Sequence, residues 1–265
     1  MAGSAPPKPI RAAPRRPDPA LAAEAVERLL DALGLPAEVR GAEDLAGTPR
    51  RVAEAWLEDL VDGYGREPAE ILAGAIPSAG KDLVAVTGID FHSVCPHHLL
   101  PSRGVAHVAY LPGGRVVGFG QIVKLVDALA HRLVLEEDLA RQIAEALVAH
   151  VGARGAACVL EAEQLCMTVR GERRVGARAH AEAWSGALAE DGPPRRRFQA
   201  LVGRARAGGS RASRSGSRSG SGSRSGSGSR SGSGSRSGSR SGSRSGSRSR
   251  SRSRFGSGSF GRGGR

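Results

Sequence analysis

Apolar residues recur at helical spacing in two stretches near the start of the chain. The first follows Asp18-Pro19 and ends at Gly34, and the second follows Thr48-Pro49 and ends at Gly63. A short polar residue followed by proline is typical of a helix N-cap with proline in the first turn. We therefore predict a helix in each stretch. Their apolar faces consist of Leu21, Ala25, Leu29 and Leu33, and of Val52, Trp56, Leu60 and Val61.

From Asp82 onwards the sequence consists of short runs rich in β-branched residues, and Pro112-Gly113-Gly114 marks a turn. Such runs predict strands, and two later segments with helical periodicity predict amphipathic helices. The order is helices, hairpin, two helices, hairpin, which predicts an α+β fold with antiparallel sheet. The predicted strands are 82–94, 104–111, 115–119, 156–169 and 177–184, and the helices between them are 121–133 and 136–152.

The two ends of the chain lack a pattern that would bury a core. Residues 1–17 are rich in Pro, Ala and basic side chains, and residues 188–265 run into Arg-Ser and Gly-Ser repeats. Such composition predicts disorder. We therefore expect a disordered arm over 1–17, one folded domain over 18–187 and a disordered tail over 188–265.

The charge of the chain lies mostly in this tail. The chain has 39 Lys and Arg against 26 Asp and Glu, a formal net charge of +13, and residues 204–265 contain 16 arginines and no acid. Clustered arginine favours contact with nucleic acid or another polyanion. The alternative is a low-complexity extension without such a role, and composition alone leaves both open.

Several classes of protein are excluded by pattern. The first twenty residues lack the apolar stretch of a secretory signal, and no run approaches the ~18–20 apolar residues of a membrane span. Three cysteines without an export signal make a disulfide scaffold improbable. We expect a cytoplasmic protein without membrane contact, whose thiols are reduced.

The densest cluster of reactive residues is Cys95-Pro96-His97-His98, and Cys166 follows in a strand-like segment. Thiolate and imidazole are zinc ligands, and three protein ligands leave one tetrahedral position for water, as in catalytic sites. Buried cysteine and packed histidine are the alternative. Cys158, in the apolar run AACVL, is assigned to the core.

The segment from about Leu21 to Gly186 resembles the type I GTP cyclohydrolases. The resemblance implies a tunnelling fold, in which hairpins of several subunits join into a barrel, and ring-shaped homo-oligomers, commonly decamers. It also implies conversion of GTP and water to formate and 7,8-dihydroneopterin triphosphate. The matching motifs are GTPRRVAEAW (Gly47–Trp56), CPHHLLPSRGVAHVAYLPGGRVVGFGQIVKLVD (Cys95–Asp127), RLVLEEDLARQIAEAL (Arg132–Leu147) and VLEAEQLCMTVRG (Val159–Gly171).

The resemblance assigns roles to particular residues. It makes Cys95, His98 and Cys166 the ligands of a Zn²⁺ ion, which would lower the pKa of a bound water for attack on the guanine ring. His97 would transfer protons, and Glu137 would bind the guanine edge. The positions that match the family's phosphate site are Arg51, Gln121, Lys124 and Arg170.

The chain departs from the family pattern within the expected site. Pro96 replaces a glutamate, Gln164 replaces a second catalytic histidine, and Gln121 and Lys124 replace lysine and arginine. An amide does not exchange protons near neutral pH. Four alternatives therefore stay open. The protein could complete the reaction, stop at the ring-opened formamidopyrimidine, act on another guanine derivative, or form a non-catalytic ring that binds a ligand. Nucleic-acid binding through the tail is compatible with each.

Overall fold

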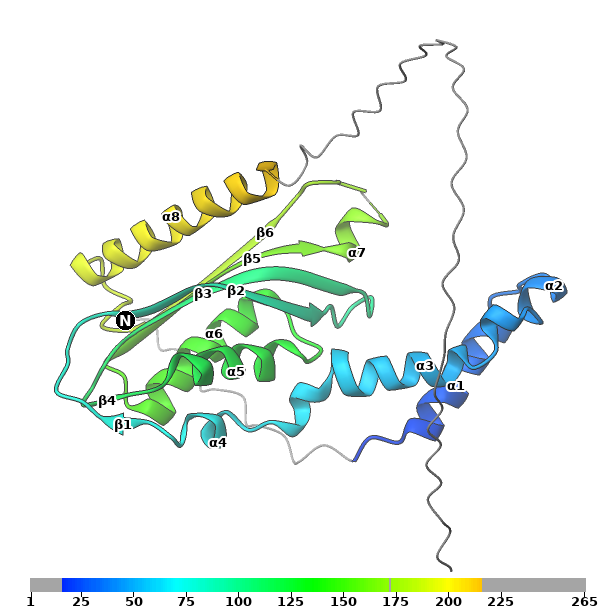
Figure 1. Cartoon of the computed structure of the whole chain (residues 1–265), viewed down its shortest axis with the longest axis horizontal. Helices are drawn as coiled ribbons and strands as arrows, with labels where there is room; N and C mark the ends of the chain where they lie inside the picture. Colours follow the sequence, from blue (N-terminus) through cyan, green and yellow to red (C-terminus); the bar gives the residue numbers. More distant parts are fainter. Residues whose placement is uncertain (1–15, 172, 216–265) are drawn as a thin grey trace, which may run out of the picture. The chain divides into compact units, whose positions relative to one another are not determined.

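The computed structural model describes residues 16–171 and 173–215, and its centre is a four-stranded antiparallel sheet (Figure 1). The strands lie in the order β2-β3-β5-β6, so that β2 and β6 form the two edges. Most of the expected arm, and the tail from residue 216, lie outside the described residues. The strands are β2 (Val84–Val94), β3 (Pro101–Leu111), β5 (Gly155–Gln164) and β6 (Ala179–Gly186).

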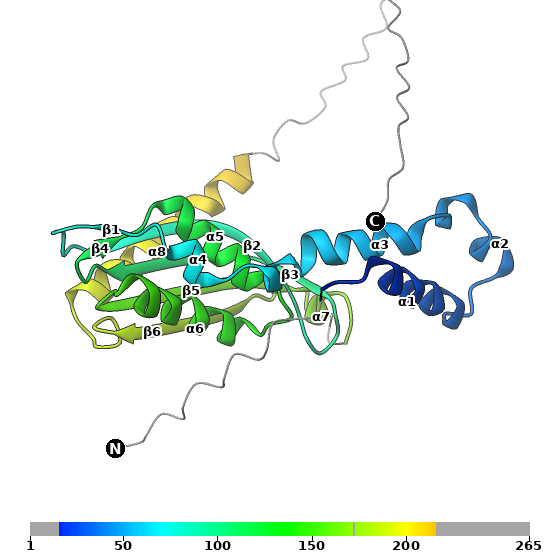
Figure 2. The ribbon, with the colours of Figure 1, turned by 90° about the horizontal axis from the view of Figure 1, so that it is seen from below.

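Two amphipathic helices cover one face of this sheet (Figure 2). Helix α5 (Phe119–Ala130) contacts β2, and α6 (Glu136–Ala146) contacts β5 and β6. Their apolar stripes pack on alternate residues of the strands, and the Cys158 side chain is fully buried in this layer, as predicted. Burial raises the pKa of the Cys158 thiol far above its ordinary value. This layer also includes the π-helical turn η4 (Leu147–Val151), the short helix α4 (Pro68–Leu72) and the two-residue strands β1 (Ile76–Pro77) and β4 (Arg115–Val116).

The opposite face of the sheet is covered by α8 (Pro193–Ser215), where the sequence predicts only a tail (Figure 1). Leu188, Phe198 and Val202 are buried against β3 and β5, and the Trp184 ring meets Phe198 edge-on at 5.8 Å. The boundary at residue 188 is therefore wrong for residues 188–215. A narrow apolar stripe is enough to dock a helix on a sheet, and the surrounding arginines obscure it in the composition.

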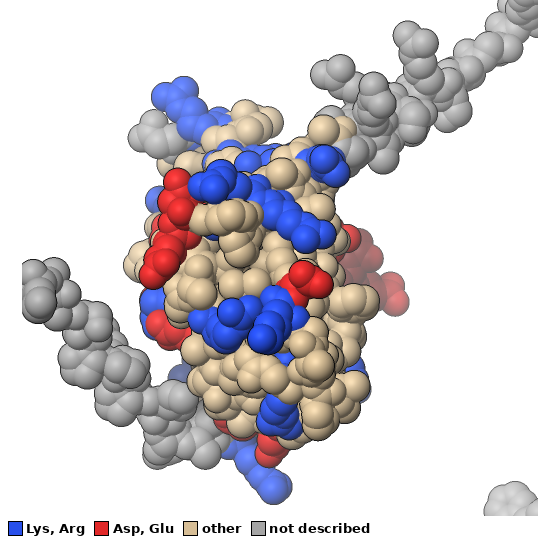
Figure 3. All heavy atoms as spheres, turned by 90° about the vertical axis from the view of Figure 1, so that its left-hand side faces the viewer, with Lys and Arg blue, Asp and Glu red and all other residues tan. Residues whose placement is uncertain are grey.

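Several arginines of α8 contact side chains of the same domain. The guanidinium of Arg195 lies 4.2 Å from the centre of the Trp184 ring, and Arg196 forms an ion pair with Asp191 at 3.0 Å. Figure 3 shows the end of the molecule at which α8 begins, where basic side chains gather near the helix and acidic ones lie among them. Some of the arginines of α8 are thus engaged in stacking and ion pairs within the domain.

The N-terminal helices form a separate layer. Helices α1 (Pro19–Ala32) and α3 (Thr48–Glu54) pack side by side, and Asp18 caps α1 by accepting from the backbone N–H groups of Ala20 and Leu21 at 3.1 and 3.0 Å. Both predicted helices are confirmed. The second continues as a π-helical stretch, η2 (Ala55–Leu60), and the 3-10 turn η3 (Asp62–Gly65). The short helices α2 (Ala37–Arg40) and η1 (Glu43–Leu45) join α1 to α3.

Gly63 joins this layer to the end of α5. Its N–H donates to the carbonyl of His131 at 3.0 Å, and a Cβ at this position would lie 2.5 Å from the carbonyl oxygen of Ala128. Gly63→Ala is therefore expected to destabilise the protein by about 1–3 kcal/mol, as overpacking does. Gly65→Ala is the matched control, because a Cβ there meets no atom within 4 Å. Urea unfolding measures both, and equal midpoints would contradict this packing.

Candidate metal centre

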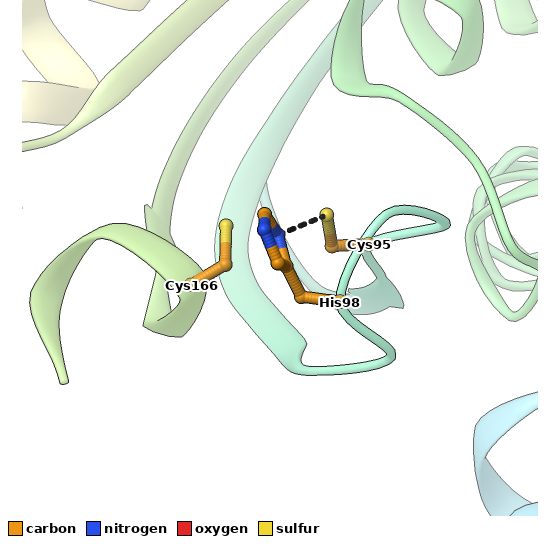
Figure 4. A group of neighbouring side chains, drawn as sticks. All are labelled: Cys95, His98 and Cys166. Atoms are coloured by element: carbon orange, nitrogen blue, oxygen red, sulfur yellow. Dashed lines mark hydrogen bonds between the residues drawn. The ribbon is translucent and has the colours of Figure 1, made fainter. Parts of the chain in front are cut away.

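A tight loop between β2 and β3 carries Cys95 and His98. The N–H of Cys95 donates to the carbonyl of Leu100 at 3.0 Å, and that of Leu99 to the carbonyl of Cys95 at 2.9 Å. Leu99 adopts a φ of 54°, in the left-handed region that a branched side chain rarely occupies. The loop turns both functional groups to one side, and Cys95 Sγ lies 3.8 Å from His98 Nδ1 (Figure 4).

Cys166 reaches the same place from the other side of β3. It lies in α7 (Leu165–Thr168), a single helical turn after β5, and not in a strand as the sequence predicts. Because β3 lies between β2 and β5, the loop after β2 and the turn after β5 emerge at the same end of the sheet. The cross-strand pairs Val94–Pro101 and Ser102–Gln164 fix this register.

The structure brings the three expected ligands together. The Sγ atoms of Cys95 and Cys166 and a ring nitrogen of His98 all lie within 4.8 Å of one another. Two ligand atoms bound to one ion at ~2.0–2.3 Å are about 3.5–3.8 Å apart in tetrahedral geometry, so small movements would close the triad on a metal. The pKa of the Cys166 thiol is raised by its burial and by the neighbouring Cys95. The donor set of two thiols and one imidazole within 4.8 Å of one another fits a metal ion such as Zn²⁺.

His97 lies beside the triad. Its side chain is exposed, and its ring centre is 6.2 Å from that of His98 in an edge-on arrangement. The ring is therefore free to meet a substrate that approaches the triad from solvent.

The expected substrate residues lie on several elements. Glu137 is exposed in the first turn of α6, Lys124 is exposed on α5, and Arg170 is exposed after α7. Gln121 and Arg51, the other two expected substrate residues, make hydrogen bonds within the domain. The Gln121 amide bonds to Ile71 O at 3.1 Å and Gly118 N at 3.0 Å, and the Arg51 guanidinium donates to Ala46 O, Asp44 O and Thr48 Oγ1 at 2.8–3.0 Å.

Sequence reasoning overlooked Glu136. Its side chain is only 6% exposed, whereas Glu137 points to solvent. The helical periodicity of α6 could have indicated that Glu136 is buried. Glu136 lies three and seven residues before the buried Leu139 and Ile143, and therefore on the same face of the helix. The Glu136 carboxylate accepts hydrogen bonds from Ser102 Oγ and Gln164 Nε2, each at 2.8 Å.

The fold and the triad define an α+β protein with a three-ligand centre of the kind that metal-dependent hydrolases use. Among the helices of the described residues, none combines the length and apolarity needed to cross a bilayer.

Comparison with known proteins identifies the family. The family model for GTP cyclohydrolase I matches residues 22–203. GTP cyclohydrolase 1 of Chromobacterium violaceum is 45% identical over 157 residues, which cover 59% of this chain and 76% of that protein. GTP cyclohydrolase 1 of Ralstonia nicotianae is 45% identical over 174 residues, or 66% and 82%. That of Campylobacter lari is 39% identical over 184 residues, or 69% and 95%. The chain belongs to the GTP cyclohydrolase I family of hydrolases, and the expected α+β, tunnelling-fold class is thereby confirmed.

Proposed function

We propose that this protein opens the imidazole ring of GTP by hydrolysis and yields formate and 7,8-dihydroneopterin triphosphate, with Zn²⁺ held by Cys95, His98 and Cys166. The observation that carries the proposal is the convergence of these three side chains, from the loop after β2 and from α7, at one end of the sheet. A Zn²⁺ ion held by these residues would act as a Lewis acid and would lower the pKa of a water molecule that it activates.

The residues around the triad bind the substrate and move protons. The exposed His97 imidazole accepts and returns protons at its ring nitrogens while C–N bonds break. The Glu137 carboxylate accepts hydrogen bonds from the N–H groups of the guanine edge. The cationic side chains of Arg170 and Lys124 bind the triphosphate, Lys124 as a point charge.

The sheet supports a ring-shaped homo-oligomer, and we propose a decamer. Strands β2 and β6 are edges within the described residues, so each has a side that the strand of a neighbouring copy could pair with. The leucines of α1 support further contacts, because Leu21, Leu29 and Leu33 have exposed fractions of 62%, 58% and 58%.

Gln164 favours a second candidate, a slow enzyme that stops after ring opening or acts on a different guanine derivative. The Gln164 side chain lies 3.6 Å from Cys166, at the position for which the resemblance predicts a histidine. Loss of one general acid–base group costs about 10²–10⁴-fold in rate. The ring-opened formamidopyrimidine would then accumulate.

The test is incubation of the zinc-loaded full chain with GTP, followed by mass spectrometry of the nucleotides and a formate assay. Formate with dihydroneopterin triphosphate supports the full reaction. The formamidopyrimidine alone supports the second candidate, and unchanged GTP rules out both for this substrate. GDP, GMP and guanosine assayed in parallel show whether another guanine derivative is preferred.

Lys124→Ala is expected to raise the KM for GTP about tenfold, because a hydrogen bond to a charged group is worth roughly 1.5–3 kcal/mol and exposure reduces this value. Lys81→Ala, which removes another exposed lysine outside the proposed site, is the control. Steady-state kinetics on GTP measure both. An unchanged KM in Lys124→Ala would exclude Lys124 from the phosphate site.

A further inference from the structure

Glu137 belongs to the first turn of α6, and no side chain caps this turn. Leu135, which precedes the helix, has no polar group that could accept from the free backbone N–H groups. The Glu137 side chain is exposed and forms no hydrogen bond or ion pair with another described residue, whereas its neighbour Asp138 pairs with Arg141 at 2.8 Å. The Glu137 carboxylate is therefore free to meet a ligand, but none of its own contacts fixes its position.

Glu136 ties this turn of the helix to the sheet. Its buried carboxylate accepts at Oε1 from Ser102 Oγ of β3 and at Oε2 from Gln164 Nε2 of β5, each at 2.8 Å. Ser93 Oγ of β2 adds a longer contact to Oε1, at 3.4 Å. The first turn of α6 is thus bound to three neighbouring strands through one side chain.

These hydrogen bonds restrict the turn more narrowly than apolar packing would. Burial of a carboxylate is costly, and an apolar residue of similar size often stabilises such a place as well or better. Stability alone therefore does not account for Glu136. Hydrogen bonds are directional, and a buried polar network whose groups are paired holds one arrangement. Since β3 and β5 bind different oxygens, the carboxylate cannot rotate or shift without losing a partner.

The strand ends that hold this turn also carry the triad. The N–H of Val134, just before α6, donates to the carbonyl of Val94 at 3.2 Å, and Val94 directly precedes Cys95. Gln164 likewise lies two residues before Cys166. The first turn of α6 and the triad therefore share one support.

We propose that Glu136 is a positioning residue for the substrate, which ties the first turn of α6 to β3 and β5 and so places the Glu137 carboxylate against the guanine edge. The inference rests on the proposed guanine-binding role of Glu137. Placement matters because a carboxylate accepts well from two adjacent N–H groups only when both oxygens are in line with them. Gln164 then has a task that suits an amide, since it donates a hydrogen bond and exchanges no proton.

The test compares two ligands that differ only at the guanine edge. In 7-deaza-GTP a carbon replaces a nitrogen of the five-membered ring, so hydrolysis does not open this ring, and the edge proposed to meet Glu137 is unchanged. In 7-deaza-ITP the exocyclic amino group is also missing, which removes one donor to the carboxylate. Calorimetric titration of the zinc-loaded full chain gives the ratio of the two affinities. Because both ligands meet the same metal and phosphate sites, changes in either site cancel in this ratio.

The wild type is expected to bind 7-deaza-GTP about 10- to 100-fold more tightly than 7-deaza-ITP, as one hydrogen bond to a charged group would give. Glu136→Ala and Glu137→Ala are each expected to reduce this preference to about threefold or less. In the Glu137→Ala background, Glu136→Ala should change it no further, because both act through one carboxylate. Asp138→Ala is the matched control. It removes another carboxylate of the same turn, one that pairs with Arg141 and not with the sheet, and should keep the wild-type preference.

Each result decides between distinct conclusions. A Glu136→Ala variant that binds both ligands more weakly but keeps the wild-type ratio has lost only stability, and this outcome overturns the positioning role. If Glu137→Ala loses the preference and Glu136→Ala keeps it, the positioning role fails while guanine recognition by Glu137 stands. If the wild type shows no preference, the guanine recognition of the proposed function fails, and the positioning role fails with it.

Two further variants keep the test decisive if Glu136→Ala does not fold. Glu136→Met fills a similar space without an acceptor and is expected to lose the preference, and a wild-type ratio in this variant overturns the proposal. Glu136→Gln can keep both ties, because its oxygen accepts from Gln164 and its amide donates to the Ser102 hydroxyl. It should therefore retain most of the preference. A loss as complete as in Glu136→Met would show that the negative charge matters and not the ties to the sheet, and it would overturn the positioning role.

Discussion

Replacing Cys95 with serine is expected to abolish zinc binding and to lower turnover of GTP by about 10³-fold or more. A serine hydroxyl keeps its proton near neutral pH and is a poor ligand for zinc, so the triad falls to two ligands. Charge stabilisation by a bound metal is worth several kcal/mol, and each ~1.4 kcal/mol corresponds to a factor of ten in rate. Metal analysis of the purified protein and a formate assay measure the two effects.

Cys158→Ala is the matched control for this substitution. It also removes a thiol, but from the core and not from the triad, and should retain both metal and turnover at some cost in stability. Chelation of the wild type should reproduce the Cys95→Ser result, and added Zn²⁺ should reverse it. Wild-type turnover in metal-free protein would contradict the proposed centre.

Replacing His97 with asparagine is expected to lower kcat for GTP by about 10²–10⁴-fold while zinc stays bound. The asparagine retains polarity and part of the volume, but it does not exchange protons. Because His97 is exposed beside the triad and is not one of its three ligands, its loss should leave the metal content unchanged. Single-turnover assays and metal analysis separate the two effects.

His150→Asn provides the control, since this histidine is exposed at the end of η4. It should leave both kcat and metal content at wild-type values. Loss of zinc in His97→Asn would show that this ring helps to hold the metal, and unchanged kcat would exclude it from proton transfer.

Much of the fold could be predicted from local patterns. The Asp18 cap, the two N-terminal helices, the antiparallel hairpins and the buried Cys158 all follow from spacing, and the structure confirms them. Their signals are strong because one face of each element is buried throughout. Helix α8 was not predicted, because its apolar residues Phe198 and Val202 stand among many arginines. Their burial also depends on a sheet surface that residues distant in the sequence form.

The triad could be proposed from residue types, but the network behind it could not. Cys95, His98 and Cys166 stand out because thiol and imidazole are distinctive metal ligands. Glu136 and Gln164 carry no such signature, and they meet only because α6 begins above the ends of β3 and β5. Contacts of this kind depend on tertiary packing, so a periodicity that places Glu136 on the buried face is the strongest signal available in the sequence.

The two open edges of the sheet have a consequence for how the stability of this protein is to be measured. Strands β2 and β6 each present backbone N–H and C=O groups on one side, which no other strand of the described residues covers apart from the single bridge between Val94 and Leu133. In the proposed ring, neighbouring copies would satisfy these groups, so folding and association would form one equilibrium. The melting temperature would then rise with protein concentration by mass action, and a value measured at one dilution would describe the assembly at that dilution and not the isolated chain.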